Sequence, residues 1–284
     1  MLHRVDARQG RYLGVDMGGS GTRAYLLQAP AAPRRWQAPG GNLALDPKAA
    51  LQVLLPVVRM AAPDAACIGL AGARTASDAV AWLAAQLEQQ ACRVTVMTDA
   101  DLALTAAFGT TADGIVVCTG TGSVAAVRHE GATHLIGGHG FLFDDGGSAY
   151  DIGKRLITAA LRDRDRGGQS LVGEVEVLIG DSIDAFVRRA YADPVDREPL
   201  ARLAERIPAM QNPRGREILT EAAEDLVYLA RTAQERFGPL PIRLMGGVFR
   251  IPVVAETLRQ RCGAALARTR PEVAAARLAA RADA

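Results

Sequence analysis

The sequence predicts an α/β protein made of two related halves, each built around a mixed β-sheet. The first observation is an apolar stretch at 12–27 with the order strand, glycine-rich turn, strand. The second is the return of this order at 114–128, about a hundred residues later, a spacing that fits ordinary domain sizes. The third is the alternation of short strands and helices after each hairpin. We therefore expect two domains, 1–109 and 110–284, that face each other across a cleft, with the last helix packing back on the first domain.

Composition is that of an ordinary globular protein. The chain has 284 residues, of which 49% are hydrophobic and 23% charged, so the composition excludes disorder and fibrous repeats. The net charge of +2 comes without a basic block, which gives no indication of nucleic-acid binding. No apolar run is long enough to cross a bilayer, so no membrane partner is expected.

The four cysteines are isolated from one another in the sequence. None forms a CxxC pair or a Cys/His cluster at metal-ligand spacing, which is typical of small core residues in a reducing compartment. The N-terminal residues are polar and lack the apolar segment of a secretory signal. We expect a cytoplasmic protein. Its oligomeric state is left open, with a homodimer as one alternative.

The first half begins with the hairpin at 12–27 and a Pro- and Gly-rich segment at 30–42, which is either loop or irregular edge strand. Asp46 and Pro47 are an N-cap and an N1 proline, so they start a helix, with a bend or interruption near Pro56. The remaining expected elements are a strand at 67–70, a helix at 78–90 capped by Ser77, a strand at 93–97, and a helix that starts within 98–101 and reaches 108.

The second half repeats the opening hairpin with strands at 115–118 and 124–128. Glycine and proline then divide the chain into further segments. These are a loop at 136–141, a helix at 149–162, broken helical segments over 163–212, a helix at 214–237 stopped by Gly238 and Pro239, a strand at 242–245, a helix at 251–262, and a last helix from Pro271.

The first turn suits a phosphate group. Glycines let backbone N–H groups approach an anion, and serine and threonine add hydroxyl donors. Asp16, at the end of the first strand, offers a carboxylate to a phosphate-bound Mg²⁺. A bland hairpin turn is the competing interpretation, because no lysine follows the glycines as in a Walker A loop. The candidate phosphate contacts are Gly18, Gly19, Ser20, Gly21 and Thr22.

The second turn has five small residues in a row between two β-branched strands. A tight hairpin needs only one or two glycines, so repeated hydroxyls and amides favour a second phosphate clamp. Its candidate contacts are Thr119, Gly120, Thr121, Gly122 and Ser123.

Asp99 lies where a strand gives way to a helix, so it is either an N-cap or a catalytic carboxylate. Ligands of open α/β folds sit at the carboxyl edge of the sheet, where Asp99 would accept a proton from a substrate hydroxyl. The two roles are compatible, since a capping carboxylate keeps one oxygen free. Asp101 is the alternative for the same assignment.

Other polar or bare positions leave a structural alternative open. Asn42 is a turn former or a ligand, and His139 belongs to a solvated loop or a lid. Asp145 is either a turn or cap residue or a ligand for sugar hydroxyls or metal-bound water, and its neighbour Asp144 is an alternative for the same role. Gly246 and Gly247 follow a strand, where flat adenine or ribose could lie on bare backbone, although a plain strand-to-helix turn explains them almost as well.

Together these motifs resemble the acetate and sugar kinase/Hsp70/actin superfamily. More narrowly, the chain resembles the N-acetylglucosamine kinase and BadF/BadG/BcrA/BcrD-type ATPase family, from about Tyr12 to the final helix. The matching segments are GVDMGGSGTRAYLL, TDADLALTAAF, GIVVCTGTGSVA, GGHGFLFDDGGSAYDIG and LMGGVF. The resemblance implies two duplicated ribonuclease H-like, actin-like ATPase domains.

The resemblance also implies roles for individual residues. Asp99 would be the general base, and Asp16 would hold Mg²⁺ through water. The two turns would contact the ATP phosphates. The implied nucleoside contacts are Gly246 and Gly247, and the implied sugar contacts are Asn42, Gly138, His139 and Asp145. Two departures lie in the substrate loop, since His139 stands where these kinases often have Trp and Gly146 where they often have Glu.

The function expected from these residues is ATP-dependent phosphorylation of the 6-hydroxyl of an amino sugar, glucosamine or N-acetylglucosamine. Two alternatives share the fold. One is an ATP-driven activator of an iron–sulfur dehydratase or reductase, which needs suitably placed cysteines. The other is a non-catalytic sugar sensor, which usually carries a helix-turn-helix before the first hairpin.

Overall fold

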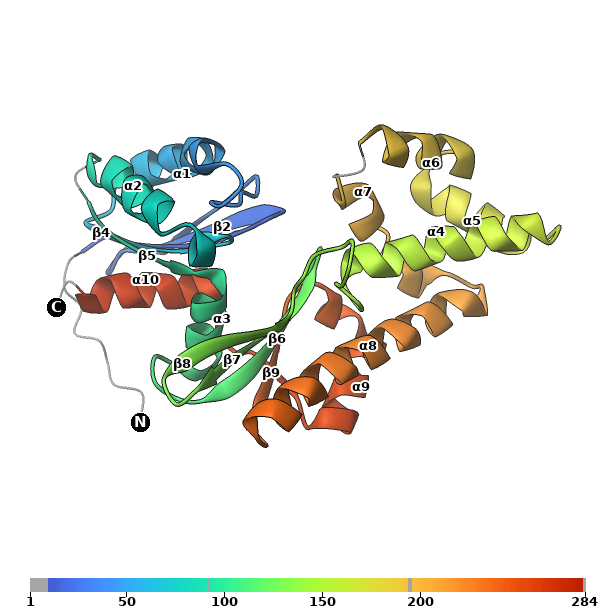
Figure 1. The fold of residues 1–284 in the computed structure, drawn as a ribbon. Coiled ribbons are helices and arrows are strands. Elements are labelled where there is room, and N and C mark those ends of the chain that lie inside the picture. The colour runs from blue at the N-terminus through green and yellow to red at the C-terminus, as the bar shows by residue number, and fades with distance from the viewer. Residues whose placement is uncertain (1–9, 91, 194–195, 283–284) are drawn as a thin grey trace. The chain divides into compact units, whose positions relative to one another are not determined.

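The computed structural model describes residues 10–90, 92–193 and 196–282, and it divides the chain into two units. Unit 1 comprises Met1–Thr111 and Arg268–Ala284, and unit 2 comprises Ala112–Ala267. The boundary thus follows residue 111, and the C-terminal segment belongs to unit 1. Each unit contains one five-stranded sheet (Figure 1).

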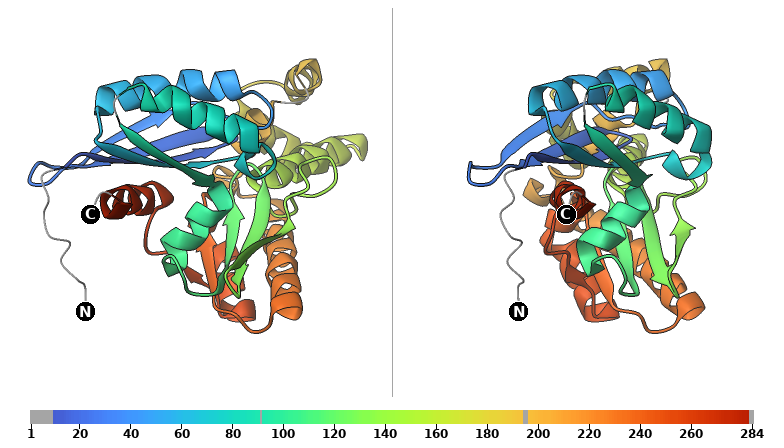
Figure 2. Two further views of the ribbon diagram at one scale, coloured as in Figure 1. Left: turned by 60° about the vertical axis from the view of Figure 1, so that its left-hand side comes forward. Right: turned by 90° about the vertical axis from the view of Figure 1, so that its left-hand side faces the viewer.

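Unit 1 is a three-layer α/β/α structure. Its sheet has the order β3-β2-β1-β4-β5, with β1 antiparallel to β2 and parallel to β4. Helices α1 and α2 cover one face, and α10 with α3 covers the other (Figure 2). The elements are β1 (Tyr12–Gly18), β2 (Gly21–Leu27), β3 (Arg34–Ala38), α1 (Pro47–Ala61), β4 (Ala65–Leu70), α2 (Ser77–Glu88), β5 (Arg93–Thr98), α3 (Asp99–Phe108) and α10 (Pro271–Ala282).

Unit 2 repeats the sheet topology of unit 1. Its order is β10-β9-β6-β7-β8, with β6 antiparallel to β7 and parallel to β9, so β6 corresponds to β1. The elements are β6 (Gly114–Thr119), β7 (Ser123–His129), β8 (Ala132–Gly137), α4 (Ala149–Asp165), α5 (Ser170–Ile179), α6 (Ile183–Ala192), α7 (Glu198–Ala201), α8 (Pro213–Phe237), β9 (Ile242–Met245), α9 (Pro252–Cys262) and β10 (Ala265–Leu266). The predicted duplication of an α/β fold is confirmed.

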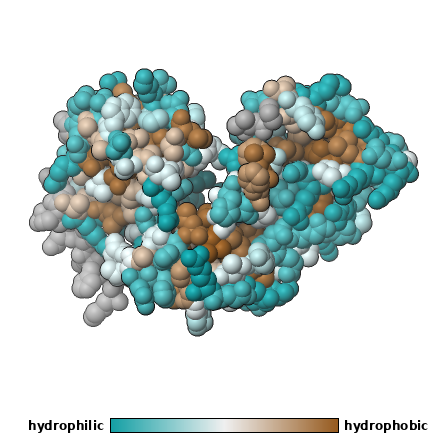
Figure 3. All heavy atoms as spheres, in the orientation of Figure 1, coloured by the Kyte–Doolittle hydropathy of each residue, from teal (hydrophilic) through white to brown (hydrophobic). Residues whose placement is uncertain are grey.

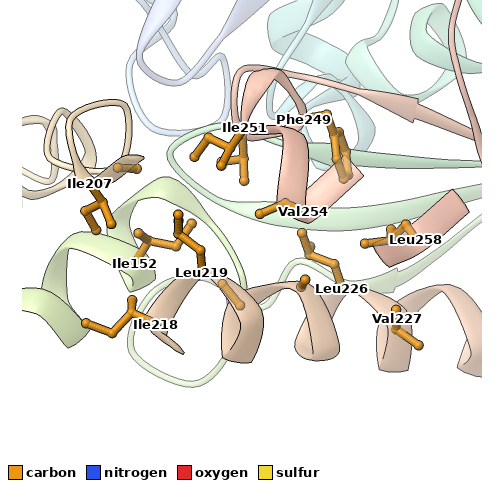
Figure 4. Packing of buried hydrophobic residues seen from close by; sticks show 14 of the residues in the cluster. Ile152, Ile207, Ile218, Leu219, Leu226, Val227, Phe249, Ile251, Val254 and Leu258 are labelled. Carbon is orange, nitrogen blue, oxygen red and sulfur yellow. The ribbon is translucent and has the colours of Figure 1, made fainter. Parts of the chain in front are cut away.

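The core of unit 2 forms where α8 packs across β6, β7 and β8. Its buried aliphatic residues include Leu219, Leu226 and Val254, which lie between α8 and α9 in Figure 4. The outer face of α8 is mostly polar in the space-filling view, as expected of an amphipathic helix (Figure 3). Unit 1 has a separate buried cluster of hydrophobic residues.

Most predicted elements are present, with a few differences. The segment at 30–42 contains the edge strand β3, and α1 continues through Pro56 to Ala61 without interruption. Strand β8 and the two-residue strand β10 were not expected from the sequence. The expectation that Ser77 caps α2 is wrong, because Ala76 is the N-cap and Ser77 is the first helical residue.

Helix α10 lies unusually close to β1. A Cβ atom at Gly14 would lie only 2.0 Å from the carbonyl oxygen of Glu272 and 2.2 Å from the amide nitrogen of Ala276. The buried face of α10 is correspondingly small, with Ala275 and Ala279 among its core residues. The bare strand and the alanine face therefore allow the helix backbone to rest directly on the sheet.

Gly14→Ala should destabilise the protein by roughly 1–3 kcal/mol, because the added methyl overlaps helix backbone rather than a movable side chain. Urea denaturation measures this difference. Gly21→Ala is the matched control, since a Cβ at that strand position meets nothing within 4 Å and should leave the unfolding midpoint nearly unchanged. Equal midpoints for Gly14→Ala and wild type would contradict the close packing.

Candidate functional site

The first turn is a bare stretch of backbone between β1 and β2. Gly18 pairs with Gly21, so Gly19 and Ser20 form the tip. Neither Gly18 nor Gly21 has a φ in the left-handed region, and a Cβ at either would meet nothing closer than 3.7 Å. Neither backbone strain nor packing thus requires these two glycines, whereas a ligand in contact with the backbone would.

The segment 39–41, which follows β3, packs against the first turn and supports it. The Thr22 hydroxyl donates to the Pro39 carbonyl at 2.7 Å, and the Gly41 amide donates to the Gly18 carbonyl at 3.0 Å. A Cβ at Gly40 would lie within 2.5 Å of Gly19 and Gly21 backbone. Thr22 is buried and its hydroxyl is used inside unit 1, so its hydroxyl holds the turn in place.

Asn42 follows this supporting segment and forms a local turn. Its side-chain oxygen accepts a hydrogen bond from the Ala44 amide at 3.0 Å, and its carbonyl accepts from the amides of Leu45 and Asp46. The turn-forming role considered from the sequence is therefore present. The Nδ2 amino group is the part of Asn42 that a sugar hydroxyl could engage.

Asp16 lies near the end of β1, on the α10 side of the sheet, and carries a mostly buried carboxylate. Arg23, its cross-strand partner on β2, lies 3.6 Å away and is largely exposed. Burial raises the pKa of Asp16 to about 6; Arg23 opposes this shift, while the charges of Glu272 and Asp99 add to it. Such a carboxylate is stabilised in its charged form by a nearby cation, so the donor set fits Mg²⁺, which binds oxygen ligands.

Asp99 is the first residue of α3, and the helix is capped by its neighbours. The Thr98 hydroxyl accepts from the Asp101 amide at 3.0 Å and donates to the Asp101 carboxylate at 2.6 Å. Thr98 is therefore the N-cap, and Asp101 supports it. Asp99 accepts the adjacent Ala100 amide through Oδ1, and loss of hydration raises its pKa.

The second turn is tied to the loop that follows β8. The Ser123 hydroxyl donates to the Gly146 carbonyl at 2.8 Å, and the Thr119 hydroxyl donates to the Gly147 carbonyl at 3.4 Å. Both residues are buried, so these hydroxyls hold two loops together. A Cβ at Gly120 would meet nothing within 4 Å, and the φ of Gly120 is not in the left-handed region. As at Gly21, neither packing nor backbone conformation requires glycine at this position.

The N-terminus of α4 lies beside the second turn. The Ala149 amide, the first of this helix, donates to the Gly120 carbonyl at 2.8 Å. Ser148 caps the helix through the Asp151 amide. The positive end of the helix dipole therefore lies next to Gly120, which favours an anion there.

Asp145 links the second turn to the loop 138–148 between β8 and α4. It is buried, and its Oδ1 accepts from the Ser123 amide at 3.0 Å. Its φ of +69° lies in the left-handed region, which is strained for a residue other than glycine. Burial raises the pKa of Asp145; the Ser123 amide and Arg197 oppose this shift.

The neighbouring residues of the loop 138–148 make distinct contacts. Asp144 accepts from the His139 amide at 3.3 Å, which closes the loop on itself, while the His139 side chain is exposed. Gly138 has a φ of +75° and leaves no room for a Cβ against Val124. Gly146 lies against Asp225 of α8, which is paired with Arg155.

Arg197 was not predicted from the sequence. Its Nη1 lies 3.7 Å from Asp145 Oδ2, and its guanidinium stacks over the Phe141 ring at 5.4 Å. It is one of many arginines in the helical region 163–212, and nothing in its local sequence distinguishes it.

Packing and backbone conformation require glycine at position 246 but not at position 247. Gly246 has a φ of +123°, and a Cβ there would lie 1.9 Å from the Thr119 carbonyl oxygen. Close packing on β6 therefore explains Gly246. A Cβ at Gly247 would meet only Glu205, at 3.9 Å, so the bare backbone there is open.

The structure thus groups the predicted residues into two sets. Unit 1 contains the first turn, Asp16, Asn42 and Asp99, whereas unit 2 contains the second turn, the loop 138–148 and the Gly246–Gly247 turn. Among the described residues, no three His, Cys, Asp or Glu side chains are grouped as direct metal ligands. The helices of the described ranges are all too short or too polar for a bilayer span.

The model of the BadF/BadG/BcrA/BcrD ATPase family matches residues 13–274 of the chain. A curated relative is an N-acetylmuramic acid/N-acetylglucosamine kinase from Clostridium acetobutylicum, 34% identical over 135 residues. That alignment covers 47% of this chain and 42% of the relative, so the matched segment spans less than half of the relative's length.

Two solved structures are similar over nearly the whole chain. A candidate N-acetylglucosamine kinase from Chromobacterium violaceum has a TM-score of 0.74 and 25% identity, covering 95% of this chain and 99% of its own. A candidate N-acetylglucosamine kinase from Porphyromonas gingivalis has a TM-score of 0.78 and 19% identity, covering 96% and 100%, which shows the shared fold.

Asp16→Asn should alter the pH dependence of stability. Because the folded-state pKa of Asp16 is raised to about 6, ionisation costs the folded wild type about 3 kcal/mol between roughly pH 4 and pH 6. The variant has no such group, so its stability relative to wild type should increase by about that amount from pH 4 to pH 7 in metal-free buffer. Urea titrations at both pH values test this, and an equal difference at both would contradict the buried charge.

Proposed function

The chain belongs to the BadF/BadG/BcrA/BcrD ATPase family, and from this membership we propose that it is an ATP-dependent sugar kinase that phosphorylates the 6-hydroxyl of glucosamine or N-acetylglucosamine. The kinase names of the Clostridium and Chromobacterium relatives support an amino sugar as the acceptor. The observation that carries the proposal concerns Asp99, the first residue of α3. Thr98 and Asp101 cap this helix, so the Asp99 carboxylate is not needed as the cap.

In the proposed reaction, Asp99 accepts the proton of the sugar hydroxyl as that oxygen attacks the γ-phosphorus and ADP leaves. A raised pKa makes Asp99 a stronger base than an ordinary aspartate, provided that it is ionised at the working pH. Its Oδ2 is the oxygen for this role, since Oδ1 accepts the Ala100 amide.

The two turns are the proposed phosphate contacts. Gly21 and Gly120 are the bare positions that packing does not explain, and both lie in hairpins of equivalent topology. Buried hydroxyls at Thr22, Thr119 and Ser123 shape the turns, so backbone amides rather than these hydroxyls would meet the phosphates.

Asp16 is the proposed residue that holds Mg²⁺, through water. Bound Mg²⁺ supplies positive charge that offsets the charge on the transferring phosphoryl group. The environment of Asp16 supports this role, because its carboxylate is partly dehydrated and near two other carboxylates.

Asn42, Gly138, His139 and Asp145 are the proposed sugar contacts. The Nδ2 group of Asn42 would donate to a sugar oxygen, since its Oδ1 accepts the Ala44 amide. The Oδ2 of Asp145, which lies 3.7 Å from Arg197 Nη1, would accept from a sugar hydroxyl. The exposed His139 and the bare Gly146 are the positions that depart from the sugar kinases of this resemblance, so they are the places to seek acceptor selectivity. Gly247 is the more open of the two proposed nucleoside contacts.

The test is sugar-dependent ADP release across a panel of hexosamines, with the phosphorylated position identified by NMR. Wild type should phosphorylate an amino sugar, and Asp99→Asn should lower kcat by about 10²–10⁴, the usual contribution of a general base. Wild-type kcat/KM should also decline as the pH falls through the raised pKa of Asp99, since the protonated form accepts no proton.

Asp101→Asn is the matched control because its carboxylate serves the Thr98 cap. It should lose stability while keeping activity within about tenfold of wild type. Comparable activity in Asp99→Asn and wild type would rule out Asp99 as the base. ATP hydrolysis at a rate that no sugar changes would instead favour an energy-coupling ATPase. Sugar binding without turnover would favour a sensor.

A further inference from the structure

Glu272 is a buried acid. Its side chain is only 3% exposed, and its Oε2 has no hydrogen-bond partner among the described residues of unit 1. Its ion-pair partner is Arg270, whose Nη1 lies 3.9 Å from Oε1 and whose side chain is 67% exposed. A solvated arginine at that distance compensates a buried carboxylate poorly.

The position of Glu272 places it beside Asp16. The Glu272 backbone packs against β1 at Gly14. Because alternate residues of a strand share a face, Asp16, two residues after Gly14, lies on the same face of the sheet. Gly69 is the β4 partner of Asp16, and Leu102 of α3 covers it. Asp16 therefore lies on the face of β1 that α10 and α3 cover.

The electrostatic field at Asp16 agrees with this geometry. The negative charge of Glu272 raises the pKa of Asp16 more than the charge of Asp99 does. Desolvation is the larger cause, and Arg23 acts in the opposite direction. Three carboxylates thus share one region of unit 1.

The duplication of the fold gives Glu272 a counterpart. In the first repeat, α3 follows the outermost parallel strand β5 and begins with Asp99. In the second repeat, α10 follows the outermost parallel strand β10, and Glu272 is its second residue. Both helices belong to unit 1 and pack against each other, so an acid from the first turn of each helix lies in one unit.

Helix capping does not explain this residue. An acid in the first turn of a helix usually lies at the surface, where it interacts with the helix dipole and remains hydrated. Glu272 is buried among the alanines of α10, and its Oε2 accepts no backbone N–H. A neutral residue would satisfy the packing without the cost of a buried charge, so the charge itself requires another explanation.

We propose that Glu272 is a second carboxylate for the nucleotide-bound Mg²⁺, acting together with Asp16 through the water shell of the ion. The inference rests on the use of Mg²⁺ with ATP in the proposed function. Mg²⁺ usually keeps several waters and takes one or two carboxylates, which agrees with the absence of a three-ligand cluster among the described residues.

The test measures metal binding rather than turnover. Mn²⁺ binding to the full chain in the presence of ADP is followed by electron paramagnetic resonance for wild type, Glu272→Gln and Glu272→Asp. Loss of a group that orients metal ligands typically weakens binding 10–100-fold, so Glu272→Gln should bind Mn²⁺ about tenfold or more weakly. Glu272→Asp keeps the charge and should recover part of the affinity.

Glu88→Gln is the matched control, because it removes one exposed glutamate of α2 from the same unit. It should bind Mn²⁺ as wild type does. Unchanged affinity in Glu272→Gln, or an equal loss in Glu88→Gln, overturns the proposal.

Urea denaturation in metal-free buffer separates a metal role from a structural one. Since the amide removes an uncompensated charge, Glu272→Gln should unfold at the same or a higher urea concentration than wild type. A lower midpoint together with an equal loss of metal-free ADP affinity means that Glu272 maintains the fold, and it overturns the proposal.

Failure of this inference is distinguishable from failure of the proposed function. If no sugar is phosphorylated while Glu272→Gln weakens Mn²⁺ binding, the metal role stands and the kinase assignment falls. If an amino sugar is phosphorylated and Mn²⁺ binding is unaffected by Glu272→Gln, the kinase assignment stands and the metal role is overturned.

Discussion

The contact between α10 and β1 is the constraint on which the acidic region of unit 1 depends. Only a glycine at position 14 allows the helix backbone to lie against the strand, and Gly69 similarly accommodates Leu102 of α3. These two bare positions bring the starts of both helices to the end of β1. The charges of Glu272 and Asp99 both act on Asp16, so local packing creates the electrostatic character of the site.

Features determined by short stretches of chain were predictable from the sequence. Both hairpins, the cap and proline of α1, and the long helix α8 follow from turn glycines, capping residues and apolar periodicity. The duplication was also visible, because each sheet begins with the same hairpin and the strand orders match. Asp99 was recognisable from its place after a strand.

Features that depend on residues far apart in sequence were not predictable in the same way. Thr119 and Ser123 looked like phosphate donors, yet their hydroxyls donate to carbonyls more than twenty residues away. Arg197 can be recognised as a site residue only through its ion pair with Asp145. Glu272 can be recognised only through the packing of α10 on β1. A pattern of residue types carries no information about such partners until the chain has folded.

The hydrogen bonds from the second turn to residues 145–147 join two loops into one body. Ser123 contributes both its amide and its hydroxyl to this junction, and Asp145 holds a strained conformation to complete it. A ligand that orders either loop therefore lowers the entropic cost of ordering the other. By thermodynamic reciprocity, two ligands that each order one of these loops would strengthen each other's binding to the same degree.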